Sequence, residues 1–276
     1  MLACDEGIAS TIGLSEAMRA EGVPVVSVLE NALDQQTLSA AEKHLNHGKT
    51  ADDWVRIVYG SGTNTHNVDF AEAADALLDV MGEFPQVKLR LVGLLELPQE
   101  FKQFKSRIER IEFCEYDQYL GYLSECDISI APLENYVFNE AKSNIKFLEA
   151  SIVKVPSVCS PRSAFTSVIV DGENGLLAET SADWKQALSS LVESTELRKS
   201  LAESAYETVL SQYKPVNIAR AQLAPLLKIS PAKKPAKKIL SVNIYYSPDS
   251  FGGATIVAEQ VNRLLHQRDG FEVSVF

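Results

Sequence analysis

Cysteine, methionine and tryptophan are scarce in this 276-residue chain, which has 4, 3 and 2 of them. No two cysteines are spaced as a CxxC pair, so neither a disulfide framework nor a cysteine-based zinc site is expected. No apolar run reaches the roughly 18 residues of a membrane-spanning helix. The first ten residues also lack the basic start and apolar stretch of a signal peptide. The sequence therefore predicts a cytoplasmic protein with free thiols, no metal and no transmembrane segment.

Positive charge is also scarce: the chain has 26 Lys and Arg but 37 Asp and Glu, which gives a formal net charge of -11. An acidic surface repels phosphate backbones, so nucleic acid is not an expected partner. One basic stretch, KISPAKKPAKK at residues 228–238, has five lysines and two prolines. Proline excludes a regular helix, so we interpret this stretch as an extended linker. A membrane or nucleic-acid tether is the alternative for such a run.

Strand-like and helix-like patterns alternate between residues 56 and 177. Apolar, β-rich runs occupy 56–61, 87–93, 127–132 and 155–160, and another begins in 111–116. Segments with helical spacing separate them, at 70–82, 101–108, 117–126 and 143–153, and three more helical stretches follow between 181 and 227. This alternation is typical of βαβ crossovers, which build a parallel sheet covered on both faces. We therefore expect an α/β fold with a doubly wound, Rossmann-like sheet.

The two ends resemble parts of other units. Residues 1–50 contain one strand-like segment, 23–34, and two helical stretches, whereas 239–276 have the pattern of a single strand–helix–strand unit with a glycine loop, FGGA. Such a unit cannot bury a core alone. The sequence predicts four parts: 1–50, the tail end of a preceding domain and a hinge; 51–227, the Rossmann-like domain; 228–238, the Lys/Pro linker; and 239–276, the first βαβ unit of a following domain.

Two loops at the carboxyl ends of predicted strands, where open parallel sheets bind ligands, contain candidate site residues. The first loop follows the strand at 56–61 and begins Gly60, Ser61, Gly62, Thr63. Its glycines allow close backbone approach, its hydroxyls can donate to an anion, and a helix N-terminus follows. The loop lacks the third glycine of a dinucleotide fingerprint. The alternative is a tight turn in which Asn67 or Asp69 caps the helix.

The second loop runs from residue 132 into the helix predicted at 143–153. On a helix, Lys142, Lys146 and Glu149 lie at offsets 0, 4 and 7, on one face. Two ammonium groups near a helix start are unfavourable because the dipole there is already positive, and an anion between them relieves this, with Ser143 adding a hydroxyl. Glu149 can accept hydrogen bonds from the hydroxyls of a ribose. The alternative is a solvated face with a Lys146–Glu149 pair worth about 0.2–0.5 kcal/mol.

Several segments resemble one known family in the correct order. NEAKSNIKFLEASIVKVPSVCS (139–160) and DGENGLLAETSADWKQAL (171–188) resemble the carboxyl-terminal half of retaining GT-B glycosyltransferases of the "glycosyl transferases group 1" family. YGSGTNTHNVDF (59–70) is similar to its first glycine loop and SECDISIAPLE (124–134) to its A-D-I-x-x-x-P segment. Residues 25–34 resemble the family's interdomain hand-over, and 239–265 the opening of an amino-terminal domain. We therefore expect an excised piece of a longer, tandem glycosyltransferase with amino-terminal remnants at both ends.

The resemblance implies a nucleotide-sugar donor site in this domain. The implied donor-binding residues are Lys142, Ser143 and Lys146 at the diphosphate, Glu149 at the ribose, Gly60, Ser61, Gly62 and Thr63 facing the phosphates, and His66 at a position that is often basic. The implied activity is a retaining, hexosyltransferase-like transfer from a UDP- or GDP-sugar to a glycan or lipid-linked acceptor hydroxyl, without metal or cofactor. We expect the fragment to be inactive alone, and the full-length protein to be cytoplasmic or peripheral at the inner membrane face.

One departure from the family pattern concerns its paired glutamates. The family places seven residues between them, whereas eight separate Glu140 from Glu149, and Ala141 occupies the in-register position. The role of Glu140 at the donor sugar therefore stays open. This spacing also favours a rival interpretation, a degenerate glycosyltransferase-like scaffold. A further rival, an NAD-binding oxidoreductase domain, requires a third glycine after the first strand and an acidic residue closing the second, where this chain has THN and LVGLLE.

Overall fold

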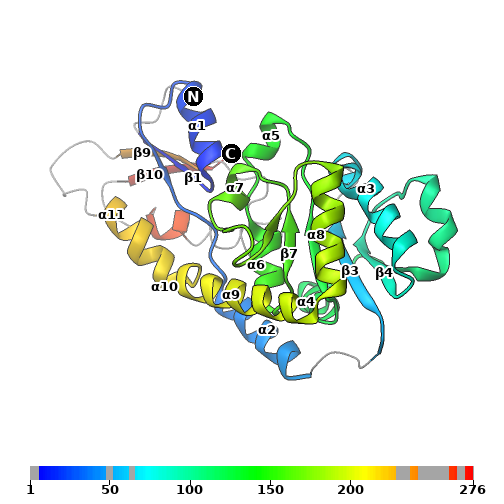
Figure 1. Cartoon of the computed structure of the whole chain (residues 1–276). Coiled ribbons are helices and arrows are strands. Elements are labelled where there is room, and N and C mark those ends of the chain that lie inside the picture. Colours follow the sequence, from blue (N-terminus) through cyan, green and yellow to red (C-terminus); the bar gives the residue numbers. More distant parts are fainter. Residues whose placement is uncertain are drawn as a thin grey trace.

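Two parallel sheets form the frame of the protein (Figure 1). The computed structural model describes residues 6–47, 52–61, 66–227, 237–241, 261–265 and 271–275. The larger sheet has six strands in the order β5-β4-β3-β6-β7-β8, and each paired strand is parallel to its neighbour. These strands are β3 (Val55–Ser61), β4 (Val87–Gly93), β5 (Ile108–Ile111), β6 (Ile128–Ala131), β7 (Ser157–Cys159) and β8 (Leu176–Leu177).

Helices cover both faces of this sheet, which confirms the expected doubly wound α/β fold. Side chains alternate along β3, so that Ile57 and Tyr59 join a core with α3 and α8, whereas Val58 joins a second core with α4, α6 and α9. Trp184 of α8 is fully buried in the first core. The helices are α3 (His66–Glu83), the 3₁₀-helix η1 (Gln99–Arg107), α4 (Tyr116–Ser124), α5 (Val137–Glu140), α6 (Ile145–Ile152), α7 (Ser163–Thr166), α8 (Ser181–Glu193) and α9 (Thr195–Gln212).

The strand order locates the point where the winding reverses. From β3 the chain adds β4 and β5 on one side, then returns to add β6, β7 and β8 on the other. Strands β3 and β6 are therefore neighbours, and the helices that follow them, α3 and α6, lie on opposite faces of the sheet. In sheets of this kind a crevice opens beyond the carboxyl ends of these two strands, and ligands bind there.

The smaller sheet joins the two ends of the described chain. Its order is β10 (Phe271–Val275), β9 (Lys237–Ser241), β1 (Glu6–Ala9) and β2 (Val26–Val28), all parallel. Helix α1 (Ile12–Ala20) packs on this sheet through Met18, which contacts Val23 and Val26. The sequence predicts two different domains for the terminal segments, whereas here β1 and β9 are hydrogen-bonded neighbours. The four-part division of the chain itself stays a prediction.

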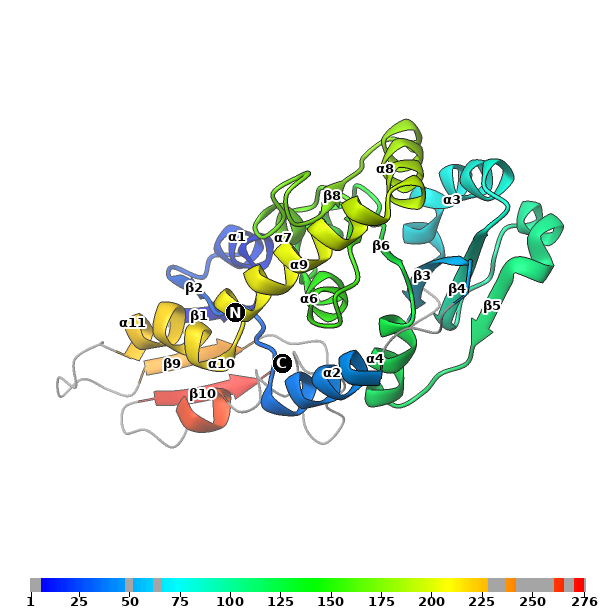
Figure 2. The same cartoon turned by 60° about the horizontal axis from the view of Figure 1, so that its bottom comes forward.

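Residues 29–34 and the helices after α9 connect the two sheets. The backbone N–H of Leu33 donates to the carbonyl of Tyr213 (2.8 Å), and Gln222 Nε2 donates to Glu30 Oε2 (2.6 Å). A series of helices runs from the larger sheet to the smaller (Figure 2): α9, α10 (Pro215–Ile218), the π-helix η2 (Ala219–Leu223) and α11 (Ala224–Leu227). Helix α2 (Gln35–His47) packs against α4. None of the described helices is both long and apolar enough to cross a lipid bilayer.

Several element boundaries differ from the sequence predictions. Strand β1 was not predicted, and β5 ends at Ile111, where the predicted strand was to begin. The ladder with residues 89–92 of β4 sets the position of this short edge strand, and its half-exposed pattern provides little apolar signal. The predicted helix at 101–108 is a 3₁₀-helix, and Lys237 and Lys238 belong to β9 rather than to the linker. The FGGA loop lies outside the described residues.

Candidate functional site

A buried aspartate ties helix α3 to the loop after β6. Asp69, in the first turn of α3, is 3% exposed. Its Oδ1 accepts from the backbone N–H of Glu134 (3.2 Å) and from Asn139 Nδ2 (2.9 Å). Its Oδ2 lies 2.7 Å from Lys142 Nζ. Asp69 therefore holds the loop after β6 against the helix that follows β3, whereas its position in the sequence predicted only a helix cap.

Lys142 lies before helix α6 rather than on it, which corrects the prediction of one helical face for Lys142, Lys146 and Glu149. Helix α6 begins at Ile145, and α5 ends at Glu140. The ion pair with buried Asp69 holds Lys142 in the turn between the two helices. Its side chain is 26% exposed, whereas that of Asp69 is 5% exposed, so the lysine is the more accessible member of the pair.

Lys146 is in the first turn of α6, and its amine is buried although part of its stem is exposed. Nζ lies 4.4 Å from the centre of the Tyr59 ring and has no hydrogen-bond partner among the described residues. Burial lowers the pKa of Lys146 to about 8, while the charge of Asp69 opposes this and that of Lys142 adds to it. Since a buried, unpaired polar group costs about 1–3 kcal/mol or more, this position favours an anionic ligand.

Glu149 lies one turn further along α6 and is also buried. Burial raises its pKa to about 7, and Tyr116, Lys146 and Tyr119 each act in the opposite direction. Both tyrosines come from α4, and burial raises the pKa of each hydroxyl. Gly60, at the end of β3, leaves room for this arrangement, because a Cβ there would lie 2.9 Å from Tyr119 Oη.

Ser61 is the one hydroxyl-bearing residue of the first glycine loop that lies within the described residues. Its hydroxyl donates to the carbonyl of Leu94 (2.5 Å), a hydrogen bond that an anion would have to replace. Gly62 and Thr63 lie outside the described residues. His66 is the first residue of α3, and its side chain also lies outside the described part.

Glu140 and Ser143 are the two remaining candidate residues of the second loop. The Glu140 carboxylate accepts a hydrogen bond from the backbone N–H of Ser163 (2.8 Å), at the start of α7. That oxygen is therefore directed to the protein backbone. Ser143 is half-buried in the turn that separates Lys142 from α6.

Tyr59 and Asp69 are the site residues that sequence reasoning missed. Tyr59 is fully buried, and burial, with the neighbouring charge of Asp69, raises the pKa of its hydroxyl. The strand order supplies the missing signal. Once β3 and β6 are recognised as the point of reversal, polar residues that follow either strand are expected at one edge.

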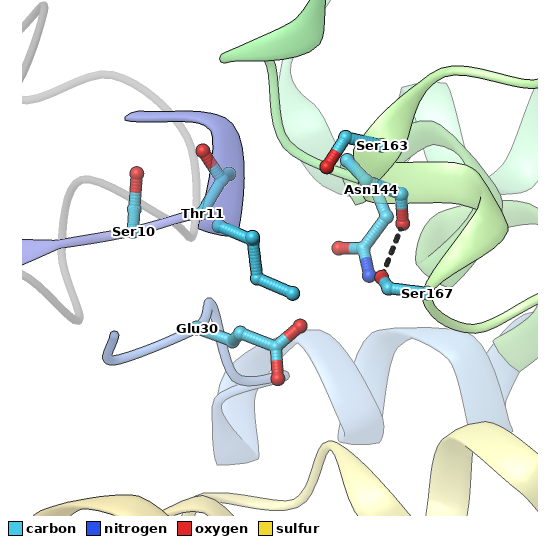
Figure 3. Close-up of a pocket in the computed structure, with 8 residues that line it drawn as sticks. Ser10, Thr11, Glu30, Asn144, Ser163 and Ser167 are labelled. Carbon is cyan, nitrogen blue, oxygen red and sulfur yellow. Dashed lines mark hydrogen bonds between the residues drawn. The ribbon is translucent and has the colours of Figure 1, made fainter. Parts of the chain in front are cut away.

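A small hollow lies beside the crevice, where α1 meets α6 and α7. Figure 3 shows Ser10 and Thr11 on one wall, Asn144, Ser163 and Ser167 on the other, and Glu30 between the walls. Its volume of about 10 Å³ suits one water molecule. The hollow is therefore a narrow gap between α1 and the helices α6 and α7, and it is too small for a sugar.

Comparison with known proteins identifies a matching family model and several similar structures. A family model described as "Glycosyl transferases group 1" matches residues 55–194. The structure is similar to Anabaena HepE in complex with UDP and glucose, at 17% identity and TM-score 0.61, over 81% of this chain and 62% of HepE. It is also similar to WaaG, a glycosyltransferase involved in lipopolysaccharide biosynthesis, at 14% identity and TM-score 0.60, over 81% and 62% of the two chains.

A third similar structure is sucrose-phosphate synthase from Thermosynechococcus elongatus, at 15% identity and TM-score 0.58, over 81% of this chain and 58% of the enzyme. At these identities the likeness concerns the fold. This chain thus spans less than two thirds of the length of all three proteins. No curated protein matches the sequence.

Proposed function

Because the chain belongs to the glycosyl transferases group 1 family, whose model matches residues 55–194, we propose that residues 51–227 are the carboxyl-terminal, donor-binding domain of a retaining GT-B glycosyltransferase. The observation that carries the proposal is the buried amine of Lys146 at the reversal point of the sheet, which has no hydrogen-bond partner among the described residues and has Lys142 nearby. The HepE structure holds UDP and glucose, which supports a UDP-linked hexose as the donor class, with a GDP-sugar as the alternative.

The chemistry of sugar transfer explains why two ammonium groups belong in this crevice. An acceptor hydroxyl attacks the anomeric carbon on the face that the diphosphate leaves, the bond from that carbon to the β-phosphate oxygen breaks, and the electron pair remains on the diphosphate, which takes up the hydroxyl proton. Fixed positive charge that meets the developing negative charge lowers the barrier. Lys142 and Lys146 supply this charge in our proposal, together with the N-terminus of α6.

The diphosphate competes with Asp69 for Lys142. In the structure described here the Lys142 ammonium is paired with that carboxylate at 2.7 Å. The Lys146 amine needs no such exchange, because it has no hydrogen-bond partner in the described part of the chain. Since its pKa is about 8, we expect nucleoside diphosphate affinity to fall as the pH rises through 8 and the free amine loses its charge.

Glu149 is proposed as the acceptor of hydrogen bonds from the donor ribose. With a pKa of about 7 its carboxylate gains charge at neutral to alkaline pH, and a carboxylate oxygen can accept from both hydroxyls of a diol. The loop from Gly60 to Thr63 and His66 are proposed to face the phosphates. The acceptor is proposed to be a glycan or a lipid-linked sugar.

A second candidate function is a scaffold that binds the nucleotide but transfers little sugar. The observation in its favour is the Glu140 carboxylate, which is directed to the Ser163 backbone. Since this chain spans 62% of the length of HepE, we also propose that it transfers little sugar by itself. An assay with UDP-glucose that shows robust transfer or retention-specific turnover by this chain would contradict this part of the proposal.

Titration calorimetry with UDP, GDP and NADH tests the donor-site proposal. We expect UDP or GDP to bind and NADH not to bind, and Lys142→Met to weaken binding by about 10-fold or more, because a charged hydrogen bond is worth about 1.5–3 kcal/mol. Lys154→Met is the matched control, since that amine pairs with Glu203 on the surface. Binding of NADH alone, or no binding of any probe at millimolar concentration, would overturn the proposal.

A further inference from the structure

Helix α1 begins directly against the loop that carries Lys142. Thr11, the N-cap of α1, accepts from the backbone N–H of Leu14 (3.1 Å) and donates its hydroxyl proton to the carbonyl of Ala141 (2.9 Å), 130 residues away. Both hydrogen-bonding functions of this side chain are therefore in use, one within the helix and one across to the loop. The residue is 5% exposed.

Gly13 allows the backbones of α1 and the loop to touch. A Cβ at this position would overlap the carbonyl oxygen of Glu140 and would lie 2.7 Å from the carbonyl carbon. These are backbone atoms, so no side-chain rotation can relieve the overlap. Glycine is otherwise unfavourable inside a helix by about 1 kcal/mol relative to alanine, so the close approach explains its presence here.

The segment from Asn139 to Lys142 is held from three directions. Asp69 of α3 accepts from Asn139 and Lys142, and the Ser163 backbone of α7 donates to Glu140. These two supports come from the larger sheet and its helices. The third support, α1, follows a strand of the smaller sheet. The position of the Lys142 backbone therefore depends on how the smaller sheet meets the larger one.

We propose that Thr11 and Gly13 are positioning residues for the donor diphosphate, which they affect through the carbonyl groups of Glu140 and Ala141 and thus through Lys142. The inference rests on the proposed donor-binding function. It adds that the smaller sheet, through α1, completes a site whose charged side chains, Lys142, Lys146 and Glu149, follow β6 of the larger sheet. The hollow beside this contact has room for about one water molecule, and its lining residues come from both α1 and the start of α7 (Figure 3).

The test compares Gly13→Ala with Gly82→Ala by calorimetry with UDP and GDP. Gly82 is an exposed residue of α3 whose added Cβ would meet nothing within 4 Å, so it is the matched control. We expect Gly13→Ala to weaken nucleotide binding by 10-fold or more and Gly82→Ala to leave it unchanged. An unchanged affinity in Gly13→Ala overturns the inference but not the donor site, whereas absence of binding by the native chain overturns both.

Thr11 provides a second route if Gly13→Ala does not fold. Thr11→Val removes the hydroxyl that reaches Ala141, and Thr11→Ser keeps it. We expect the valine variant to bind UDP or GDP about 3- to 10-fold more weakly and the serine variant to bind as the native chain does. Equal affinity in both variants would overturn the inference.

A double variant separates positioning from a general structural role. If Gly13 acts through Lys142, adding Gly13→Ala to Lys142→Met should weaken nucleotide binding by less than 2-fold. If Gly13 supports only the stability of the fold, its effect should be the same in both backgrounds. An undiminished effect in the Lys142→Met background would therefore contradict the inference.

Discussion

Replacing Lys146 by methionine should make the protein more stable and the donor site weaker at the same time. Methionine keeps an unbranched apolar stem of similar length and removes the buried ammonium. The native ammonium has no hydrogen-bond partner among the described residues and lies 4.4 Å from the centre of the Tyr59 ring. A residue kept for packing would be expected to lose stability on substitution, whereas a residue kept for a ligand should gain it.

The expected gain in stability follows from the pKa of Lys146. A fall from 10.5 to about 8 corresponds to about 3 kcal/mol of destabilisation at neutral pH, at about 1.4 kcal/mol per pH unit. The contact with the Tyr59 ring offsets about 1–2 kcal/mol of this when desolvated, so we expect Lys146→Met to gain about 1–2 kcal/mol. At about 2–4 °C per kcal/mol for a domain of this size, the melting temperature should rise by about 2–8 °C.

The pH dependence provides a further check on the same variant. Between pH 8 and 10.5 the folded protein has lost the Lys146 proton while the unfolded chain still binds one, so native stability rises with pH over this window. Lys146→Met lacks this rise, and its advantage over the native chain should vanish near pH 10.5. Urea denaturation at pH 7 and at pH 10 measures the difference.

The assay pairs the thermal melt with calorimetry on UDP and GDP. Loss of a charged contact worth about 1.5–3 kcal/mol should weaken binding by about 10- to 100-fold. Lys154→Met, which removes an exposed amine paired with Glu203, should change neither quantity appreciably. The reasoning is refuted if Lys146→Met melts several degrees lower than the native protein and binds the nucleotide equally well.

Three other substitutions have defined outcomes. Asp69→Asn keeps the side-chain oxygen that accepts from Asn139 and should free Lys142 for the ligand, so that UDP or GDP binds about 5-fold more tightly by calorimetry, at about 1 kcal/mol for the displaced ion pair; weaker binding would contradict a competition between the diphosphate and Asp69 for Lys142. Glu149→Gln should remove the fall in native stability that occurs between pH 4.5 and 7. In this range the folded carboxyl, with its pKa of about 7, binds a proton that the unfolded chain has lost, which amounts to about 2–3 kcal/mol in urea denaturation. An unchanged pH profile of stability would contradict this. Gly93→Ala should lower the free energy of unfolding by more than about 1 kcal/mol, since φ is +96° and a Cβ would overlap a strand carbonyl, whereas Gly82→Ala should raise it.

The larger sheet was predictable because its signals are local and strong. Along β3, Ile57 and Tyr59 face one core and Val58 the other, so the strand has the continuous apolar pattern of a sheet buried on both sides. Strand β1 was missed for the opposite reason. It has four residues, two of them only half-buried, and it pairs with β9, more than 200 residues along the chain. No short window of sequence contains that information.

Residue spacing selected part of the candidate site but missed Tyr59, Asp69 and the geometry. The motif around Lys146 and Glu149 selected both residues, and the structure places them on one helix. Spacing alone put Lys142 on the same helix, whereas its ion pair with Asp69, 73 residues earlier, holds it in a turn. Contacts with Thr11 and Gly13 depend on the meeting of two sheets, which residue spacing does not encode.

The phosphorus NMR spectrum of bound nucleotide tests the central claim most directly, because it reports on the diphosphate itself. UDP and GDP are each mixed with the native chain and with the double variant Lys142→Met and Lys146→Met. We predict that the β-phosphorus resonance of UDP or GDP shifts or broadens with the native chain and stays at its free position with the double variant. A β-phosphorus resonance that does not respond to the native chain, or that responds equally to both proteins, would contradict a diphosphate site at the junction of β3 and β6.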